Sequence, residues 1–148
     1  MSELKTRISD AVKAAMRAGE KTRLGTLRMM SAAIKQKEVD ERRELSDADL
    51  LAILDKMVKQ RRESLEQYEA AGREELAAVE HAEIAIIAEF LPQPLSDSEI
   101  DALIEQAIAD SGAESVRDMG KVMAQVKPQA QGRADMGAVS ARVKAQLS

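Results

Sequence analysis

Apolar residues recur at intervals of three and four along almost the whole chain, and this spacing restricts the fold more than any other feature. It places apolar side chains on one face of an α-helix, whereas a half-buried strand needs strict alternation. The first example is the series Leu4, Ile8, Ala11, Val12 and Ala15. Only Tyr68 and Phe90 are aromatic, so the core has to be aliphatic. The sequence therefore predicts an all-α protein.

Four helices are expected in the first two thirds of the chain. Their expected ranges are 3–18, about 20–39, a third helix from an N-cap at Ser46 or Asp47 to Gly72, and 73–91. Serine and aspartate favour the N-cap because their oxygens accept a free amide hydrogen of the first helical turn. The apolar spacing of the fourth helix predicts that it buries Leu76, Val79, Ile84, Ile87 and Phe90.

The stretch LPQPLSDSE, residues 91–99, marks the clearest boundary. Proline restrains the residue before it and cannot donate a helical hydrogen bond. Ser96 and Glu99 then have the spacing of a capping box. We therefore expect a helical N-terminal domain over 1–91, a hinge over 92–95, and a three-helix domain over 96–148.

The tripeptide Asp-Met-Gly occurs twice near the end of the chain, beginning at Asp118 and at Asp135. Each copy precedes an amphipathic stretch, so we expect both aspartates to be N-caps. Gly132 is expected to end the earlier helix in a left-handed conformation. The alternative is an anion site, in which free amides act together with Lys121 and Arg133. Capping explains the repeat without a ligand, and we prefer that interpretation.

The net charge of −4 is unevenly distributed. Residues 1–112 carry −7, whereas residues 113–148 carry +3. A basic segment of this size permits contact with a polyanion. The candidate contact residues are Lys121, Lys127, Arg133, Arg142 and Lys144.

A second basic feature lies in the second expected helix. Lys21, Arg28 and Lys35 are seven residues apart, so they form a nearly straight row along one side. We interpret the row as a solvated helix face opposite the apolar stripe. The alternative is a surface that follows a nucleic-acid backbone.

Arg61 lies between Met57 and Leu65 on the apolar stripe of the third expected helix. Its stem is therefore expected to be buried, with the guanidinium bonded to a carboxylate or a carbonyl.

Residues with catalytic chemistry are sparse. There is no cysteine, and His81, the single histidine, is expected on a helix beside Glu80 with a surface or helix-pairing role. Neither a nucleophile-elbow motif nor a phosphate-binding glycine loop is present. We therefore expect no independent active site, no metal site and no cofactor. The lack of cysteine and of a long apolar run also favours a cytoplasmic protein that does not enter a membrane.

Two short motifs resemble a known family. Met119-Gly-Lys-Val-Met123 followed by Gly132-Arg-Ala-Asp135 resembles the C-terminal tail shared by the GatB/YqeY family. Several N-terminal stretches are similar to its smaller, stand-alone YqeY branch: Arg23–Arg28, Lys59–Ser64, Ala71–Arg73 and Phe90–Pro92. The tail-motif residues carried over by position are Met119, Gly120, Met123, Gly132 and Asp135, together with the cations Lys121 and Arg133.

The resemblance implies a function connected with tRNA. GatB is the B subunit of the tRNA-dependent amidotransferase, and its tail helps to hold the tRNA. Our first expectation is therefore a non-catalytic module that binds tRNA or another structured RNA. An alternative is participation in glutamine-dependent carbon–nitrogen ligation, together with amidotransferase subunits or other translation proteins. A second alternative is a helical adaptor that binds a protein through the third helix.

Overall fold

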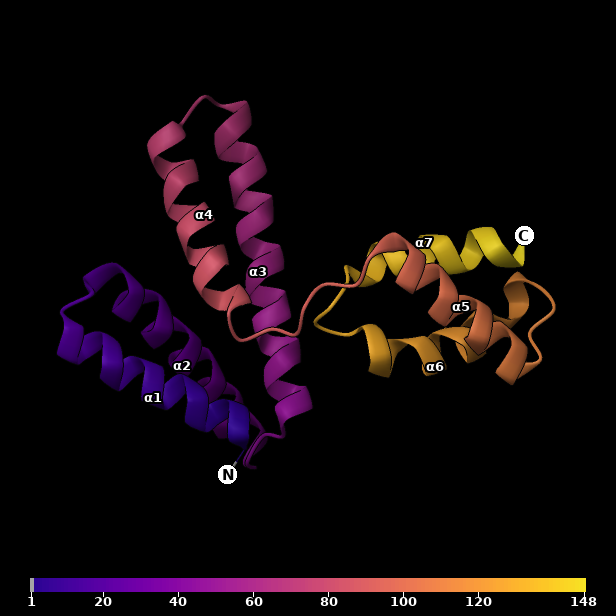
Figure 1. Cartoon of the computed structure of the whole chain (residues 1–148), viewed down its shortest axis with the longest axis horizontal. Coiled ribbons are helices and arrows are strands. Elements are labelled where there is room, and N and C mark those ends of the chain that lie inside the picture. Colours follow the sequence, from indigo (N-terminus) through magenta and orange to yellow (C-terminus); the bar gives the residue numbers. More distant parts are fainter. Residues whose placement is uncertain (1) are drawn as a thin grey trace. The chain divides into compact units, whose positions relative to one another are not determined.

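The computed structural model describes residues 2–148, and its architecture confirms the all-α prediction. The described residues form seven α-helices and one 3₁₀ turn, without a strand (Figure 1). Four α-helices precede Leu91 and three follow Pro92, as expected. The elements are α1 (Glu3–Ala18), α2 (Lys21–Glu41), α3 (Asp47–Ala70), α4 (Glu74–Ala88), α5 (Asp97–Ser111), η1 (Val116–Asp118), α6 (Met119–Ala130) and α7 (Met136–Leu147).

The chain divides into two compact units between Leu91 and Pro92. Unit 1 ends at Leu91 and contains two helical hairpins, α1–α2 and α3–α4 (Figure 1). Unit 2 begins at Pro92 and contains α5, η1, α6 and α7.

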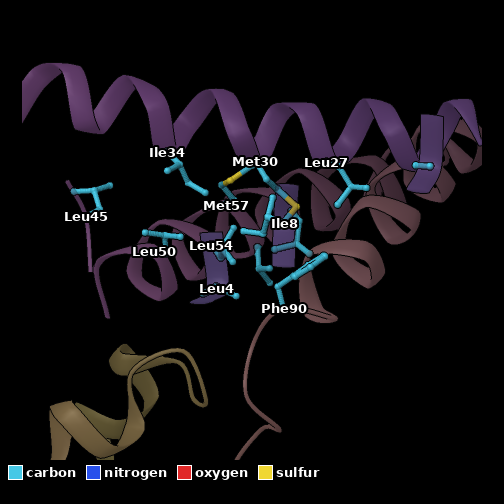
Figure 2. Packing of buried hydrophobic residues seen from close by; sticks show 13 residues of the cluster. Leu4, Ile8, Leu27, Met30, Ile34, Leu45, Leu50, Leu54, Met57 and Phe90 are labelled. Atoms are coloured by element: carbon cyan, nitrogen blue, oxygen red, sulfur yellow. The ribbon is translucent and has the colours of Figure 1, made fainter. Parts of the chain in front are cut away.

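The core of unit 1 is aliphatic apart from one ring. Leu27, Met30 and Leu54 are completely buried, and Phe90 closes one side of the cluster (Figure 2). Burial of one such leucine stabilises a fold by roughly 1.5–3 kcal/mol. The apolar stripes of α1, α2 and α3 therefore all face this single core.

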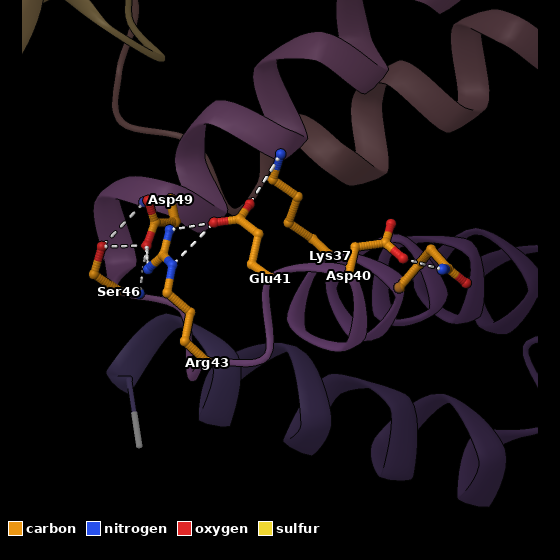
Figure 3. A network of polar contacts seen from close by, with 7 residues as sticks. Lys37, Asp40, Glu41, Arg43, Ser46 and Asp49 are labelled. Carbon is orange, nitrogen blue, oxygen red and sulfur yellow. Dashed lines mark hydrogen bonds and ion pairs between the residues drawn. The ribbon is translucent and has the colours of Figure 1, made fainter.

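A polar network fixes the connection between α2 and α3 (Figure 3). Arg43 bonds both Glu41 and Asp49, and Lys37 lies 3.0 Å from Glu41. Ser46 and Asp49 form a capping box, so the expected N-cap at Ser46 is confirmed. The bond from Arg43, with those from Ser46, holds the pKa of the Asp49 carboxyl well below its usual range.

Two expectations for unit 1 need correction. Val79 is 52% exposed and not part of the core. It lies two residues after the buried Ala77, which is about 200° around the helix, so it faces away from α3. In addition, α2 continues to Glu41, because Arg42 with a left-handed φ of 53° provides its end.

Unit 2 has its own core of Ile104, Val122, Val126, Val139 and Val143. The capping box of Ser96 and Glu99 begins α5, as expected. Asp135 caps α7 by accepting the Gly137 amide at 3.1 Å, and Gly132 follows α6 with a φ of 79°. Both expectations are confirmed.

Asp118 occupies the expected N-cap position of α6, but the expected capping bond is absent. Its carboxylate makes no capping bond to α6 and accepts the amide of Glu114 at 3.0 Å. The reason is that η1 runs directly into α6, so Asp118 is the last residue of a 3₁₀ turn. Its side chain therefore reaches back across that turn.

Candidate nucleic-acid interface

Arg142 is held by carboxylates of the same unit. Its guanidinium reaches both oxygens of Asp101, at 2.8 and 2.9 Å, and lies 3.1 Å from Asp97. The bond to Asp101 is the main cause that raises the pKa of Arg142. The arginine therefore fastens α7 to α5, and its charge is already neutralised.

Arg133 holds the proline-containing segment that begins unit 2. Its Nε donates to the carbonyl of Gln93 at 3.0 Å, and its own carbonyl accepts the amide of Leu95 at 2.8 Å. The left-handed Gly132 turns the chain between the end of α6 at Ala130 and Arg133. This part of the tail motif therefore has a structural role at residues 93–95.

Lys121 makes a weaker contact. Its ammonium lies 3.6 Å from Asp118 one turn away, while its side chain remains 66% exposed. The amide of Glu114 is the main cause that lowers the pKa of Asp118, and the charge of Lys121 adds to it. A pair of this kind holds a lysine only loosely.

Lys127 and Lys144 are exposed and have no acidic partner among residues 2–148. Lys121 and Lys127 are six residues apart, which is about 600° of helix and leaves them about 120° apart around α6. The structure therefore does not bring all five candidate cations of the tail to one face. It leaves two free lysines, one loosely paired lysine and two arginines bonded within unit 2.

The remaining tail-motif residues divide between core and surface. Met119 and Met123 are half-buried against the core of unit 2, and Met123 accepts a bond from Ser140 of α7. Gly120 is exposed, and a Cβ there would meet no neighbour within 4 Å. The methionines thus join α6 to α7.

The row of cations on α2 is more accessible to solvent than the bonded cations of unit 2. Lys21, Arg28 and Lys35 are all exposed, and none has an acidic partner in the described part of the chain. Helical rise separates successive members by about 10.5 Å. The two small residues between them, Gly25 and Ala32, are also exposed.

Arg61 and His81 have the environments expected from the sequence. The Arg61 side chain is 15% exposed, with its Nε 2.8 Å from Glu83 and an Nη 3.1 Å from the Met57 carbonyl. His81 is exposed and lies 3.4 Å from Glu69. In residues 2–148, His, Asp and Glu side chains form no group of three or more placed to hold a metal ion.

The partners of Arg142 are the residues that the sequence did not reveal. Asp101 is 41 positions away, and its helix was predicted only as an apolar stripe with a capping box. A signal was present in the composition, because residues 92–112 contain five acidic residues and no Lys or Arg.

Comparison with known proteins gives matches along most of the chain. The sequence pattern of the family described as "Yqey-like protein" matches residues 5–147. The protein "Altered inheritance of mitochondria protein 41, mitochondrial" of Pyrenophora tritici-repentis is 29% identical over 130 residues, which cover 86% of this chain and 71% of that protein. The protein of the same name from Eremothecium gossypii is 34% identical over 122 residues, covering 78% and 65%.

A third relative of that name, from Vanderwaltozyma polyspora, is 33% identical over 102 residues, covering 67% of this chain and 55% of the relative. The chain thus spans between about half and seven tenths of these relatives' length. Their names correct one expectation. They point to mitochondria rather than to the cytoplasm, so the cytoplasmic prediction is wrong. Separately, no helix in residues 2–148 has the length and apolar character needed to cross a membrane.

Proposed function

Because the chain belongs to the family of Yqey-like proteins, we propose that it is an RNA-binding module without an active site of its own. The RNA would be tRNA or another structured RNA. The observation that carries the proposal is the pair Lys127 and Lys144. Both reach solvent without an acidic partner in the described chain; Lys127 lies on α6, which contains the first part of the tail motif, and Lys144 lies on α7, which begins directly after the second part.

The relationship of this tail to the tail of GatB is part of the proposal. Its support is the order and spacing of Met119-Gly-Lys-Val-Met123 and Gly132-Arg-Ala-Asp135. Within this proposal Lys121 adds a third contact, since its side chain is mostly exposed. Arg133 and Arg142 serve chiefly to hold unit 2 together, and they contribute less to RNA affinity than the sequence alone suggested.

Titration of the full chain with bulk tRNA tests the proposal. The double variant Lys127→Gln/Lys144→Gln should weaken binding, and the slope of log affinity against log salt should become shallower by about 1.8, because each lost phosphate contact removes about 0.9. The variant Lys56→Gln/Lys59→Gln on α3 is the matched control, as it changes the net charge equally. Equal affinities and slopes for all three proteins would contradict the proposal.

A second candidate function is participation in glutamine-dependent amide transfer. It rests on the same tail motif and would involve amidotransferase subunits or other translation proteins. Adding the purified chain to a Glu-tRNA amidation assay, with and without those subunits, tests it. An unchanged rate and the absence of a complex would remove this candidate, whereas RNA binding would be unaffected by that result.

A further inference from the structure

The α1–α2 hairpin presents one side of each helix to solvent. The two helices lie side by side and run in opposite directions (Figure 1). Lys5 near the start of α1 lies 2.9 Å from both oxygens of Glu38 near the end of α2, which fixes their register. Their apolar sides, including Ile8 and Leu27, are buried in the core. The opposite sides therefore face away from α3 and α4.

The pairing of α1 with α2 places two cations of α1 on the same side of the hairpin as the row on α2. Lys13 and Arg17 lie about 80° and 120° around α1 from Lys5, in the direction away from Ile8. Both are exposed, and neither has an acidic partner among the described residues. Arg17 Nε donates to the Lys13 carbonyl at 3.4 Å, one helical turn earlier. We call the resulting surface the hairpin face; it consists of Lys13, Arg17, Lys21, Arg28 and Lys35.

The hairpin face is the most basic part of the molecule. Residues 11–37 contain seven Lys or Arg against the single acid Glu20, a net charge of +6. The Glu20 carboxylate lies 3.9 Å from Arg23, so it is engaged at the turn between the helices. Glu3 and Asp10 are the acids of α1, and both are exposed on the same outward side. Arg23 and Lys37 are paired with Glu89 and Glu41, which lie outside this range, so the unpaired positive charge is that of the five cations of the hairpin face.

We propose that the hairpin face binds the phosphate backbone of double-helical RNA. The choice of RNA as the polyanion rests on the proposed function, but the surface is separate from the tail lysines. The row on α2 is about 21 Å long by helical rise. The cations of α1 lie on the neighbouring helix, about 8–10 Å away. Two parallel rows of positive charge match two phosphate strands along a groove better than one flexible strand.

The lack of rings on the hairpin face supports a duplex over a single strand. Proteins that hold single strands stack successive bases on aromatic side chains. Phe90 is buried in the core, and Tyr68 belongs to α3. Gly25 and Ala32 instead leave the surface between the cations low, and a Cβ at Gly25 would meet nothing within 4 Å. Phosphates can therefore approach the helix closely without any contact to bases.

An anionic membrane fits this surface less well. A helix that lies in a membrane interface buries an apolar side in the lipid. The apolar sides of α1 and α2 are already buried in the protein core. The large apolar residues exposed on these helices are Met16, Met29 and Val39, which are scattered and do not form one apolar side. The hairpin face therefore offers charge without the apolar area that membrane insertion needs.

The experiment uses the full chain and three probes: a short RNA duplex, one of its strands alone, and anionic lipid vesicles. The variant Lys21→Gln/Arg28→Gln/Lys35→Gln removes the row, and glutamine preserves the helix. The variant Lys56→Gln/Lys59→Gln/Arg62→Gln on α3 makes the same change of charge elsewhere in unit 1. Circular dichroism verifies that both variants remain folded.

We expect the wild-type chain to bind the duplex more tightly than the single strand or the vesicles. The row variant should lose about tenfold or more in duplex affinity, with a salt slope shallower by about 2.7, whereas the α3 variant should stay close to wild type. The variant Asp10→Asn should bind the duplex more tightly than the wild type.

Several results would overturn the inference. Equal losses in the row and α3 variants would show that only net charge matters. Tighter binding to the single strand or to vesicles would reject the duplex as the ligand. If the tail variant Lys127→Gln/Lys144→Gln loses tRNA affinity while the row variant does not, the hairpin face fails and the proposed function stands. If no RNA binds, both fail.

Discussion

The two units differ in whether their cations are paired with carboxylates. The basic segment 113–148 carries +3, but α5 and its approach add five acids, so unit 2 as a whole carries −2. Asp97 and Asp101 of α5 bond Arg142 directly. Unit 1 as a whole also carries −2, but its residues 11–37 carry +6, and the cations of the hairpin face form no ion pair among the described residues. Packing, and not position in the sequence, decides which charges remain available.

The largest expected effect is on stability and comes from Arg61, which is bonded within unit 1, in contrast to the unpaired cations of the hairpin face in the same unit. Arg61→Met should destabilise unit 1 by about 2–3 kcal/mol, because it leaves Glu83 half-buried without its partner. Chemical denaturation measures the loss. RNA affinity below the unfolding transition should not change, since Arg61 lies outside the hairpin face.

The double variant Arg61→Met/Glu83→Gln is the control for this comparison. It removes both charges, so most of the lost stability should return. If the double variant is no more stable than Arg61→Met, the ion pair is not the reason for the loss.

A smaller effect is expected for the corresponding arginine of unit 2. Arg142→Gln removes the bonds to Asp97 and Asp101, but the Arg142 side chain is 35% exposed and solvent screens part of the interaction. We expect a smaller loss in the stability of unit 2 than Arg61→Met causes in unit 1, with little change in tRNA affinity. A several-fold loss of tRNA affinity with unchanged stability would place Arg142 in the RNA interface.

The segment that begins unit 2 gives a more local test. Arg133→Ala removes the bond to the Gln93 carbonyl, which contributes about 1 kcal/mol. Amide exchange of Leu95 should therefore become faster by up to about tenfold, while exchange within α5 stays the same. Arg117→Ala is the matched control, and Leu95 exchange at the wild-type rate in Arg133→Ala would contradict the role assigned to Arg133.

The smallest effect concerns pH. The folded-state pKa of Asp49 lies below its unfolded value, mainly because of Arg43, so this carboxylate stabilises the fold above about pH 4 and less as the pH falls further. Glu99 in unit 2 is shifted in the same direction by the Ser96 amide. The stability gap between wild type and Asp49→Asn should therefore shrink below about pH 4. Urea midpoints across pH measure it, and a gap that is constant with pH would reject this assignment.

Local features could be predicted from the sequence. The apolar spacing predicted the helices, and the pair Ser96 and Glu99 predicted a capping box that the structure contains. The position of Arg61 on an apolar stripe predicted its buried stem and its carboxylate partner. Each of these depends on residues within one helix or one turn, or on a single neighbouring helix.

The failures at Asp118 and Arg142 involve a turn of unexpected geometry and packing between distant segments. Asp118 stands at the N-cap position of α6, but it is also the last residue of the 3₁₀ turn, and its carboxylate bonds back to the Glu114 amide and not to α6. The partners of Arg142 are about 40 residues away, so helix periodicity could not reveal them. Lys13 and Arg17 joined the row on α2 only through the pairing of α1 with α2.

The most direct test measures the salt dependence of duplex RNA affinity for three proteins: the wild type, Lys21→Gln/Arg28→Gln/Lys35→Gln, and Arg133→Gln/Arg142→Gln. If the unpaired cations of unit 1 make the contacts, the slope of log affinity against log salt falls by about 2.7 in the first variant and hardly changes in the second. The opposite result would contradict the account: a slope that falls in Arg133→Gln/Arg142→Gln and stays at the wild-type value in Lys21→Gln/Arg28→Gln/Lys35→Gln.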